Sequence, residues 1–368
     1  AFLLHQMLNK LGRKCGYIGT IGFYVGEKIR SLANTTPDIY DLYAILLQCL
    51  SLGCEYVVME VSSQGLANHR VETLQFDYAV FTNLTQDHLD YHENMENYFN
   101  AKFKLFSMLR NKDAAAVNID DSYGERIYNS NKSYKSYSII KDSDLKGKIE
   151  EYHNGGMKAS VIFQGAEYFF DTKLVGDYNL YNLLGCIGVL LNLGFDIRDI
   201  IERVKRVGYV PGRFELVNEG QDFRVIVDYA HTDNGLENIL ETVRKITEKR
   251  VITIFGAGGD RDNTKRPKMA RAAAKYSDFV IITSDNPRTE DPAEITRQVE
   301  KGLTDIDFPK DKYTVIVDRE QAIRYGIEMS DAKDSLLIAG KGHEDYQILG
   351  REKIHFDDRE QARKYLKK

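Results

Sequence analysis

The sequence lacks the features that mark membrane, secreted and nucleic-acid-binding proteins. No apolar run approaches the roughly 18 residues of a membrane-spanning helix, and no signal peptide is visible. Its four cysteines, Cys15, Cys49, Cys54 and Cys186, lack the spacing of metal ligands, so we expect free, buried thiols in a reducing cytoplasm. A formal net charge of −5 gives no indication of a nucleic-acid partner or an anionic membrane.

What is present is typical of an α/β protein with a substantial core. Hydrophobic residues make up 43% and charged residues 29% of the 368 positions, a length that suggests two or three domains. Helical and strand patterns alternate along the chain, which favours α/β layers. Glycine and proline cluster in "GYVPGRFE" at 208–215, so we place a boundary near residue 210 and expect domains at 1–209 and 210–368.

The hydrophobic patterns predict separate sets of elements in the two domains. In the first we expect a strand and loop over 14–24, helices over 38–52, 95–109, 179–193 and 197–207, strands over 55–60, 78–83 and 114–120, and a hairpin around 158–163 and 167–170. In the second we expect a Rossmann-like sheet with strands over 223–227, 251–255, 279–283, 313–317 and 335–339.

Four polar clusters each follow a predicted strand of the second domain directly. They are "DYAHT" (228–232), "GAGGDRD" (256–262), "SDNPR" (284–288) and "GKGHE" (340–344). Ligands of such sheets bind off the carboxyl ends of the strands, so four clusters at one edge predict a binding site. Taken alone these glycine loops are weak signals, and "GKGHE" lacks the spacing of a Walker A loop.

Arginines in two of these clusters indicate a ligand with carboxylates. Guanidinium groups bind carboxylates bidentately, so Arg261 and Arg288 suit a zwitterionic amino acid with more than one carboxylate. We place the amine end of that ligand at Glu344. The residues predicted to bind it are Arg261, Asp285, Asn286, Arg288, Gly340 and Glu344.

In the first domain, Lys102 lies within the apolar stripe of the helix over 95–109. One interpretation is that its side chain reaches the surface, as most such lysines do. The other is a desolvated lysine with a partly neutral amine, which can add CO2 to give a metal-ligating carbamate.

Other polar residues nearby suggest a metal site completed by that lysine. Glu60 ends a predicted strand, where a carboxylate can hold Mg²⁺ beside a nucleotide, and Ser62 and Ser63 follow with hydroxyls. His88 and His92 are four residues apart, so they share one face if their segment is helical. The alternative is a pair of polar loop histidines.

Taken together, these motifs resemble the Mur ligases, and specifically the UDP-N-acetylmuramoyl-tripeptide synthetase (MurE) family. The resemblance rests on "NTTP", "MEVSS", "NLTQDHLDYH", "ENYFNAK", "GRFE", "DYAHT", "FGAGGDRD", "DNPRTEDP" and "GKGHEDYQ", in this order across nearly the whole chain. It implies a central P-loop-NTPase-like mononucleotide-binding domain followed by a Rossmann-like C-terminal domain. The family's N-terminal UDP-binding domain has no counterpart in this sequence.

The resemblance also implies a role for each matching position. Glu60 and His88 would bind Mg²⁺ together with Lys102 as a carbamate (N6-carboxylysine), while the amino-acid site would hold meso-diaminopimelate, whose second carboxylate explains Arg288. UDP-N-acetylmuramoyl-L-alanyl-D-glutamate would contact Thr35, Thr36, Ser62, Asn68 and Arg70. ATP would contact Asn182, Arg213, Asp228 and His231.

The implied activity is an ATP-dependent ligase of cytoplasmic peptidoglycan precursor synthesis. It would join meso-diaminopimelate to the D-glutamate of the UDP-muramoyl-dipeptide through an acyl phosphate, as a monomer. The alternatives are another Mur ligase or a folylpolyglutamate synthase, and a non-catalytic nucleotide- or muropeptide-binding relative.

The opening stretch "AFLLHQMLNKLGRKCGYIGTIG" begins at a helix that, in this family, follows a phosphate-binding loop of the G-x-x-G-K-[ST] kind. We therefore expect that loop and the uridine-binding domain to precede residue 1 in the complete protein. On this expectation the 368 residues alone bind the diamino acid weakly and do not hydrolyse ATP.

Overall fold

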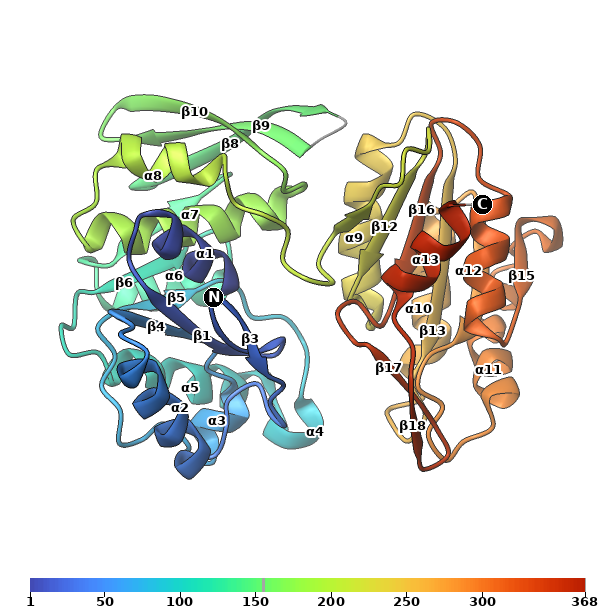
Figure 1. Cartoon of the computed structure of the whole chain (residues 1–368), viewed down its shortest axis with the longest axis horizontal. Helices are drawn as coiled ribbons and strands as arrows, with labels where there is room; N and C mark the ends of the chain where they lie inside the picture. Colours follow the sequence, from blue (N-terminus) through green and yellow to red (C-terminus); the bar gives the residue numbers. More distant parts are fainter. Residues whose placement is uncertain (154–155, 368) are drawn as a thin grey trace. The chain divides into compact units, whose positions relative to one another are not determined.

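The computed structural model describes residues 1–153 and 156–367 (Figure 1). The chain forms two compact units, Ala1–Gly208 and Tyr209–Lys368. Both combine helices with sheets that contain parallel strands, so the predicted α/β class is confirmed. No helix in the described part of the chain is long and apolar enough to cross a membrane.

The first unit begins with a four-stranded sheet in the order β3-β2-β1-β4. Its strands are β1 (Cys15–Gly19), β2 (Gly22–Val25), β3 (Glu27–Arg30) and β4 (Tyr56–Met59). The prediction of one strand and a loop over 14–24 was wrong, because β1 and β2 form an antiparallel hairpin in which Gly19 pairs with Gly22. Gly22 has a φ of +124°, which glycine allows at no steric cost. Every residue of β3 is exposed, so no apolar pattern marked this strand.

A six-stranded sheet forms the rest of the first unit, in the order β10-β9-β8-β7-β6-β5. Strands β5 to β8 are parallel, and β8, β9 and β10 are antiparallel, so the predicted hairpin is confirmed as β9 and β10. The strands are β5 (Ala79–Phe81), β6 (Ala115–Asn118), β7 (Lys135–Ser138), β8 (Leu145–His153), β9 (Gly156–Phe163) and β10 (Ala166–Thr172).

The helices of the first unit begin where side chains accept hydrogen bonds from free backbone N–H groups. Asp38 accepts from the amides of Tyr40 and Asp41, and Asn94 accepts from the amide of Asn97. The predicted helices are confirmed as α2, α5, α7 and α8. The full set is α1 (Phe2–Lys10), α2 (Ile39–Ser51), α3 (Ser63–Ala67), α4 (Leu89–His92), α5 (Met95–Ser107), α6 (Ser122–Ser130), α7 (Asp177–Asn192) and α8 (Ile197–Val204).

The second unit is built on one sheet in the order β11-β12-β16-β13-β14-β15. All five predicted strands are confirmed; they are parallel, and β11 pairs antiparallel at one edge. Near-continuous buried Val and Ile runs suit strands covered on both faces. The strands are β11 (Glu215–Val217), β12 (Arg224–Asp228), β13 (Val251–Ala257), β14 (Phe279–Ser284), β15 (Tyr313–Val315) and β16 (Ser335–Ala339).

Helices cover both faces of this sheet (Figure 1). Helices α9, α10 and α11 pack side by side, and α12 packs with α13. The helices are α9 (Asp233–Ile246), α10 (Lys265–Tyr276), α11 (Pro292–Thr304), α12 (Arg319–Glu328) and α13 (Asp358–Leu366), with a short 3-10 helix at Lys310–Lys312. A separate hairpin consists of β17 (Tyr346–Leu349) and β18 (Glu352–His355).

A buried ion pair joins α12, α13 and two strand ends. The side chains of Arg319 and Asp358 are both 0% exposed, and Arg319 Nη2 lies 2.7 Å from Asp358 Oδ2. The same guanidinium donates to the carbonyl oxygens of Ser284 (3.2 Å) and Ala339 (3.0 Å). These are the last residues of β14 and β16, the strands on either side of β13, so Arg319 connects their carboxyl ends across β13.

We expect Asp358→Asn to lower the free energy of unfolding of the second unit by about 3–5 kcal/mol, because it leaves Arg319 buried without a counter-charge. Urea denaturation of the wild type and the variant measures this difference. Glu328→Gln is the matched control: it removes a carboxylate from the exposed pair Arg324–Glu328 and should leave the unfolding curve unchanged. A decrease below about 1 kcal/mol for Asp358→Asn would contradict the expectation.

Candidate active site

The strand order of the second unit brings the four polar clusters to one edge of its sheet. Strands β12, β16, β13 and β14 are neighbours and run in parallel, so their carboxyl ends lie side by side. Asp228 ends β12, Gly340 follows β16, Gly258 follows β13 and Asp285 follows β14. The edge therefore collects backbone loops, carboxylates and arginines in one place.

A hydrogen-bonded group of Asn286, Lys341 and Glu344 lies at this edge. Asn286 Nδ2 donates to Glu344 Oε2 at 2.9 Å. Lys341 Nζ lies 3.3 Å from both Asn286 Oδ1 and Glu344 Oε2. The structure thus joins two predicted residues, Asn286 and Glu344, and adds Lys341, which sequence reasoning missed.

Gly340 and Asp285 are in close contact beside this group. Gly340 has a φ of +120°, and a Cβ at this position would lie 2.6 Å from Asp285 Oδ2. Gln347 Nε2 donates to the carbonyl oxygen of Asp285 at 2.6 Å, which fixes the β17 hairpin to the same loop. Only glycine fits at position 340 without moving Asp285.

The two predicted arginines lie next to each other at the end of β13. A Cβ on Gly258 would lie 3.1 Å from Arg288 Nη1 and 3.9 Å from Arg261 Cγ. Arg288 Nη1 donates to the carbonyl oxygen of Gly259 at 2.8 Å, and Arg261 is exposed without a hydrogen-bonded partner among the described residues. The arginines therefore retain donors that could bind a carboxylate.

A second buried cation, Arg266, holds the arginine loop in place and was also missed. Its side chain is 0% exposed and makes a bidentate ion pair with Glu290, at 2.8 Å for each nitrogen. Arg266 Nη2 also donates to the carbonyl oxygen of Gly258 at 3.1 Å. From the sequence, an arginine in a polar helix is expected at the surface. Only the tertiary contacts of Arg266 show that it is buried and holds the loop after β13.

Asp228, Arg213 and His231 lie together around Tyr229. Asp228 is buried and accepts hydrogen bonds from the amides of Phe214 and Ala230, both at 2.8 Å. Burial raises the pKa of Asp228, and nearby Arg213 opposes this shift. The guanidinium of Arg213 lies 5.0 Å from the Tyr229 ring, and the His231 ring packs on the same tyrosine. Their contact with ATP stays a prediction.

In the first unit, Glu60 follows β4 and its carboxylate has three donors. Tyr17 Oη (2.6 Å), Thr20 Oγ1 (2.7 Å) and the amide of Thr20 (3.1 Å) all donate to it. Burial opposes the ionisation of this carboxylate, whereas the hydrogen bonds from Thr20 and Tyr17 favour it and lower the pKa of Glu60. An ionised carboxylate of this kind could accept a hard cation.

Four of the residues predicted to contact the UDP-muramoyl-dipeptide surround this carboxylate's loop. Thr36 Oγ1 donates to the carbonyl oxygen of Glu60 and accepts from the amide of Ser62, and Arg70 donates to the carbonyl oxygen of Thr36, each at 2.9 Å. Thr35 reaches the same loop through Thr20, with their hydroxyl oxygens 3.0 Å apart. The hydroxyl groups of Thr36 and Ser62 already have hydrogen-bonded partners within the protein, so they stabilise the conformation of this loop.

The fifth predicted contact, Asn68, lies apart from that loop. Asn68 is exposed, and its Oδ1 accepts a hydrogen bond from Tyr91 Oη of α4 at 2.9 Å.

His88 and His92 do not act as a helical pair. His88 lies before α4 in a left-handed conformation (φ 53°), with its side chain 47% exposed beside Asp87. His92 is buried, and its Nε2 lies 2.9 Å from Ser63 Oγ. The interpretation of two histidines on one helix face was wrong, since only His88 remains open to a ligand, whereas Ser63 and His92 hold α3 and α4 together.

Lys102 is half-buried, as the desolvated interpretation requires. It lies on α5 with its Nζ 5.3 Å from the Tyr98 ring, whereas Lys104 two residues later is exposed. Burial lowers the pKa of Lys102, although Asp87 opposes the shift. The His88 ring lies 6.0 Å from the same Tyr98 ring, so Lys102 and His88 share a neighbour.

No group of three or more His, Cys, Asp or Glu side chains suited to a metal exists among the residues that the structure describes. A cation at Glu60 would therefore need other ligands, such as a lysine carbamate, phosphate or water. Asn182, the remaining predicted ATP contact, is half-buried on α7.

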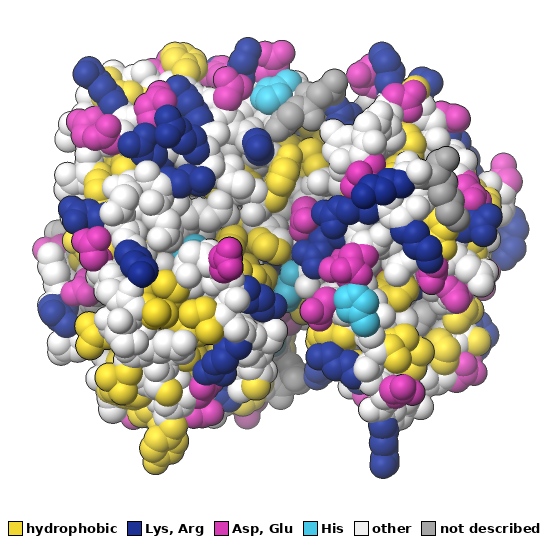
Figure 2. Space-filling view, in the orientation of Figure 1, with side chains coloured by type: hydrophobic (Ala, Val, Ile, Leu, Met, Phe, Trp, Pro, Cys, Tyr) yellow, Lys and Arg dark blue, Asp and Glu magenta, His cyan; other side chains and the backbone are white. Residues whose placement is uncertain are grey.

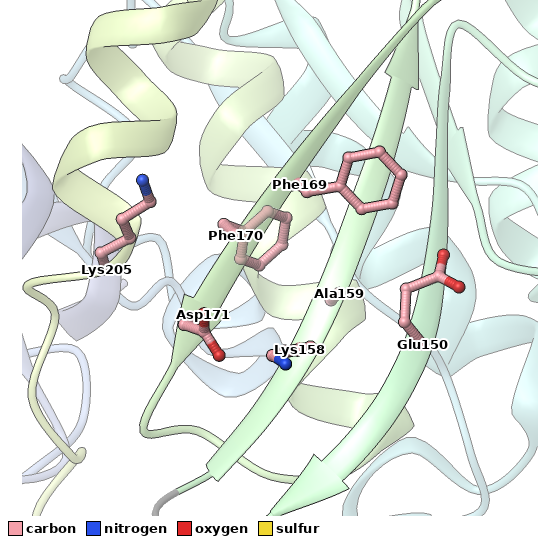
Figure 3. A pocket seen from close by; sticks show the side chains of 7 residues that line it. All are labelled: Glu150, Lys158, Ala159, Phe169, Phe170, Asp171 and Lys205. Atoms are coloured by element: carbon pink, nitrogen blue, oxygen red, sulfur yellow. The ribbon is translucent and has the colours of Figure 1, made fainter.

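A hollow of about 360 Å³ lies elsewhere, between β8, β9, β10 and Lys205 at the end of α8 (Figure 3). Lysine and arginine side chains mixed with carboxylates gather over this part of the first unit (Figure 2). None of the predicted site residues lines the hollow, and its charged groups have partners: Lys158 with Glu151, Glu150 with Lys148 and Lys205 with Glu202. We assign it no role.

Two protein-family models together match most of this chain. Residues 1–190 match the Mur ligase middle domain, and residues 212–342 match the Mur ligase, glutamate ligase domain. The UDP-N-acetylmuramoyl-L-alanyl-D-glutamate–2,6-diaminopimelate ligase of Fusobacterium nucleatum is 48% identical over 95% of this chain and 71% of its own length. That of Geobacillus thermodenitrificans is 45% identical over 99% of this chain and 76% of its own length.

Solved structures give the same result for the fold. A UDP-N-acetylmuramoyl-L-alanyl-D-glutamate–2,6-diaminopimelate ligase superposes with a TM-score of 0.71 and 31% identity, over 100% of this chain and 75% of that one. The Mycobacterium tuberculosis folylpolyglutamate synthase shares the fold at 15% identity, with a TM-score of 0.71, over 92% of this chain and 84% of that one. The chain therefore belongs to the Mur ligase family, in the group of the diaminopimelate-adding ligases.

Proposed function

We propose that the protein adds meso-diaminopimelate to the D-glutamate of UDP-N-acetylmuramoyl-L-alanyl-D-glutamate, with hydrolysis of ATP, in cytoplasmic peptidoglycan precursor synthesis. The observation that carries the proposal is the pair Arg261 and Arg288, with donors left over, at the sheet edge that also holds Glu344. The two arginines suit a carboxylate of the ligand, and the Glu344 carboxylate suits an ammonium group. A diamino acid with a second carboxylate offers both. Lysine has no such carboxylate for Arg288.

The chemistry follows from the poor electrophilicity of a carboxylate. Phosphoryl transfer from ATP turns the D-glutamate carboxylate into an acyl phosphate, which has a good leaving group. The neutral amine of the diamino acid attacks the acyl carbon and a C–N bond forms. The amine nitrogen releases one proton, and phosphate leaves with the electron pair of the broken C–O bond. Arg288 and Glu344 bind and orient the diamino acid for this attack.

Mg²⁺ fits the residues of the first unit. Three hydrogen bonds orient the carboxylate of Glu60, His88 is partly exposed, and Lys102 could contribute a carbamate oxygen. When bound, Mg²⁺ would neutralise charge on the transferring phosphoryl group. Formation of the carbamate adds CO2 to the neutral amine of Lys102 and releases one proton.

The direct test is phosphate release by the full-length protein with ATP, Mg²⁺, UDP-N-acetylmuramoyl-L-alanyl-D-glutamate and a panel of acceptors. We expect release with meso-diaminopimelate and little with L-lysine or L-glutamate. Equal release with lysine would refute the assigned acceptor. Binding of the UDP-muramoyl-dipeptide without any phosphate release would instead indicate a non-catalytic binding protein.

Arg288→Ala should raise the KM for meso-diaminopimelate about 10- to 100-fold, the usual effect of losing a hydrogen-bonded charge, and leave the KM for ATP near the wild-type value. Arg351→Ala is the control, since Arg351 is exposed in the turn between β17 and β18. Steady-state kinetics with each substrate varied in turn provide both constants. An unchanged KM for the diamino acid would remove Arg288 from the site.

Lys102 should carry a carbamate at mildly alkaline pH. Because its pKa is lowered, more of the Lys102 amine is neutral at a given pH than that of an ordinary lysine. With ¹³C-labelled bicarbonate near pH 8, NMR should show a carbamate signal that Lys102→Gln abolishes and Lys104→Gln retains. Lys102→Ala should lower ligase activity at least about 10-fold, and added bicarbonate should not restore it. Full activity of that variant would exclude a metal-binding carbamate.

A further inference from the structure

Lys341 is a completely buried lysine at the centre of the proposed amino-acid site. Its side chain is 0% exposed, and it is the second residue after β16, between Gly340 and Gly342, which both have positive φ. Lysine side chains are almost never fully buried unless they are paired, because the loss of hydration is costly. The burial of this ammonium therefore depends on the groups that it contacts.

Those groups are two residues of the site itself. Lys341 Nζ lies 3.3 Å from Glu344 Oε2 and 3.3 Å from Asn286 Oδ1, and 5.5 Å from the centre of the Tyr346 ring. Glu344 is 16% exposed, so it faces the ammonium on one side and has access to solvent. Lys341 is therefore shielded from solvent, whereas the Glu344 carboxylate is partly accessible to a ligand.

Lys341 also determines how Asn286 is oriented. Asn286 Oδ1 accepts from the amide of Ile348 at 2.9 Å in addition to its contact with Lys341, while Asn286 Nδ2 donates to Glu344. A flipped amide would place its NH₂ group against two donors, so the cation and the backbone N–H fix one orientation. The ammonium therefore contacts Glu344 Oε2 directly and, together with the Ile348 amide, supports the orientation in which Asn286 donates to the same oxygen.

We propose that Lys341 is the positioning residue of the amino-acid site: through Glu344 and Asn286 it holds the Glu344 carboxylate in the orientation that receives the ammonium group of the incoming diamino acid. This inference rests on the proposed function. Lys341 itself does not contact the ligand. Its contribution is to the binding of the diamino acid, and it does not contribute to the binding of ATP or the UDP-muramoyl-dipeptide.

Lys341→Met keeps the length of the side chain and removes its charge. We expect the KM for meso-diaminopimelate to rise about 10-fold or more, with the KM for ATP and for the UDP-muramoyl-dipeptide within about twofold of the wild type. Lys341→Arg retains a cation and should lie closer to the wild type. The control is Lys353→Met, since Lys353 is exposed and lies over the same Tyr346 ring, 3.6 Å from its centre.

A double-mutant cycle with Glu344→Gln distinguishes positioning from a general loss of structure. If Lys341 acts through Glu344, then Lys341→Met added to Glu344→Gln should change the KM for meso-diaminopimelate by less than about twofold. Multiplying effects of the two substitutions would overturn the inference. A parallel increase of all three KM values with a lower thermal midpoint in both Lys341 variants would overturn it too.

The wild-type assay separates this inference from the proposed function. If the wild type releases no phosphate with meso-diaminopimelate, the proposed function fails and the role of Lys341 fails with it. If the wild type is active and the two substitutions multiply their effects on the KM for meso-diaminopimelate, only the role of Lys341 is refuted.

Discussion

The second unit depends on cations that are buried behind its binding edge. Arg319 pairs with Asp358 and ties the ends of β14 and β16, Arg266 pairs with Glu290 and holds the loop after β13, and Lys341 lies against Glu344. Each buried cation contacts a loop that carries a predicted ligand residue. Removing such groups from water is costly, and the cost is offset only when their partners stay in place. The need to keep each buried cation paired therefore holds the loops in one conformation.

The first unit uses neutral hydrogen bonds for a comparable purpose. Tyr17 and Thr20 donate to Glu60, and Thr36 bridges the backbone on either side of the strand end. The threonine and serine hydroxyls of this region have internal partners, and the groups that remain open are His88 and the half-buried amine of Lys102. A charged substrate would thus meet a loop that is already ordered.

Much of this arrangement could be predicted from the sequence, because the information is local. Continuous apolar runs predict the strands of the second sheet, and polar clusters directly after them predict its binding edge. The β1–β2 hairpin was missed although its contacts are local, because Thr20 and Ile21, the two residues between its strands, are not typical turn residues. The exposed strand β3 has no apolar pattern, and the separate roles of His88 and His92 depend on a contact between His92 and the distant Ser63. For Arg266, Arg319 and Lys341 the sequence gives no signal at all, because a buried lysine or arginine has the same neighbours along the chain as a surface one.

The close packing of the loops after β13 and β14 has a consequence for which molecules fit. A Cβ on Gly259 would lie 1.9 Å from the carbonyl oxygen of Pro287, and the Gly259 amide donates to the carbonyl oxygen of Asn286 at 2.9 Å. Asn286 also donates a hydrogen bond to Glu344. The acidic group of the site, Glu344, and its basic group, Arg288, are therefore both positioned by the short segment 286–288. Their spacing cannot be adjusted by moving one loop alone. If Glu344 and Arg288 bind the two ends of the diamino acid, as proposed, their fixed spacing sets the length of carbon chain that fits between an ammonium and a distant carboxylate. A homologue with one methylene more or fewer would then leave one of the two groups without its partner.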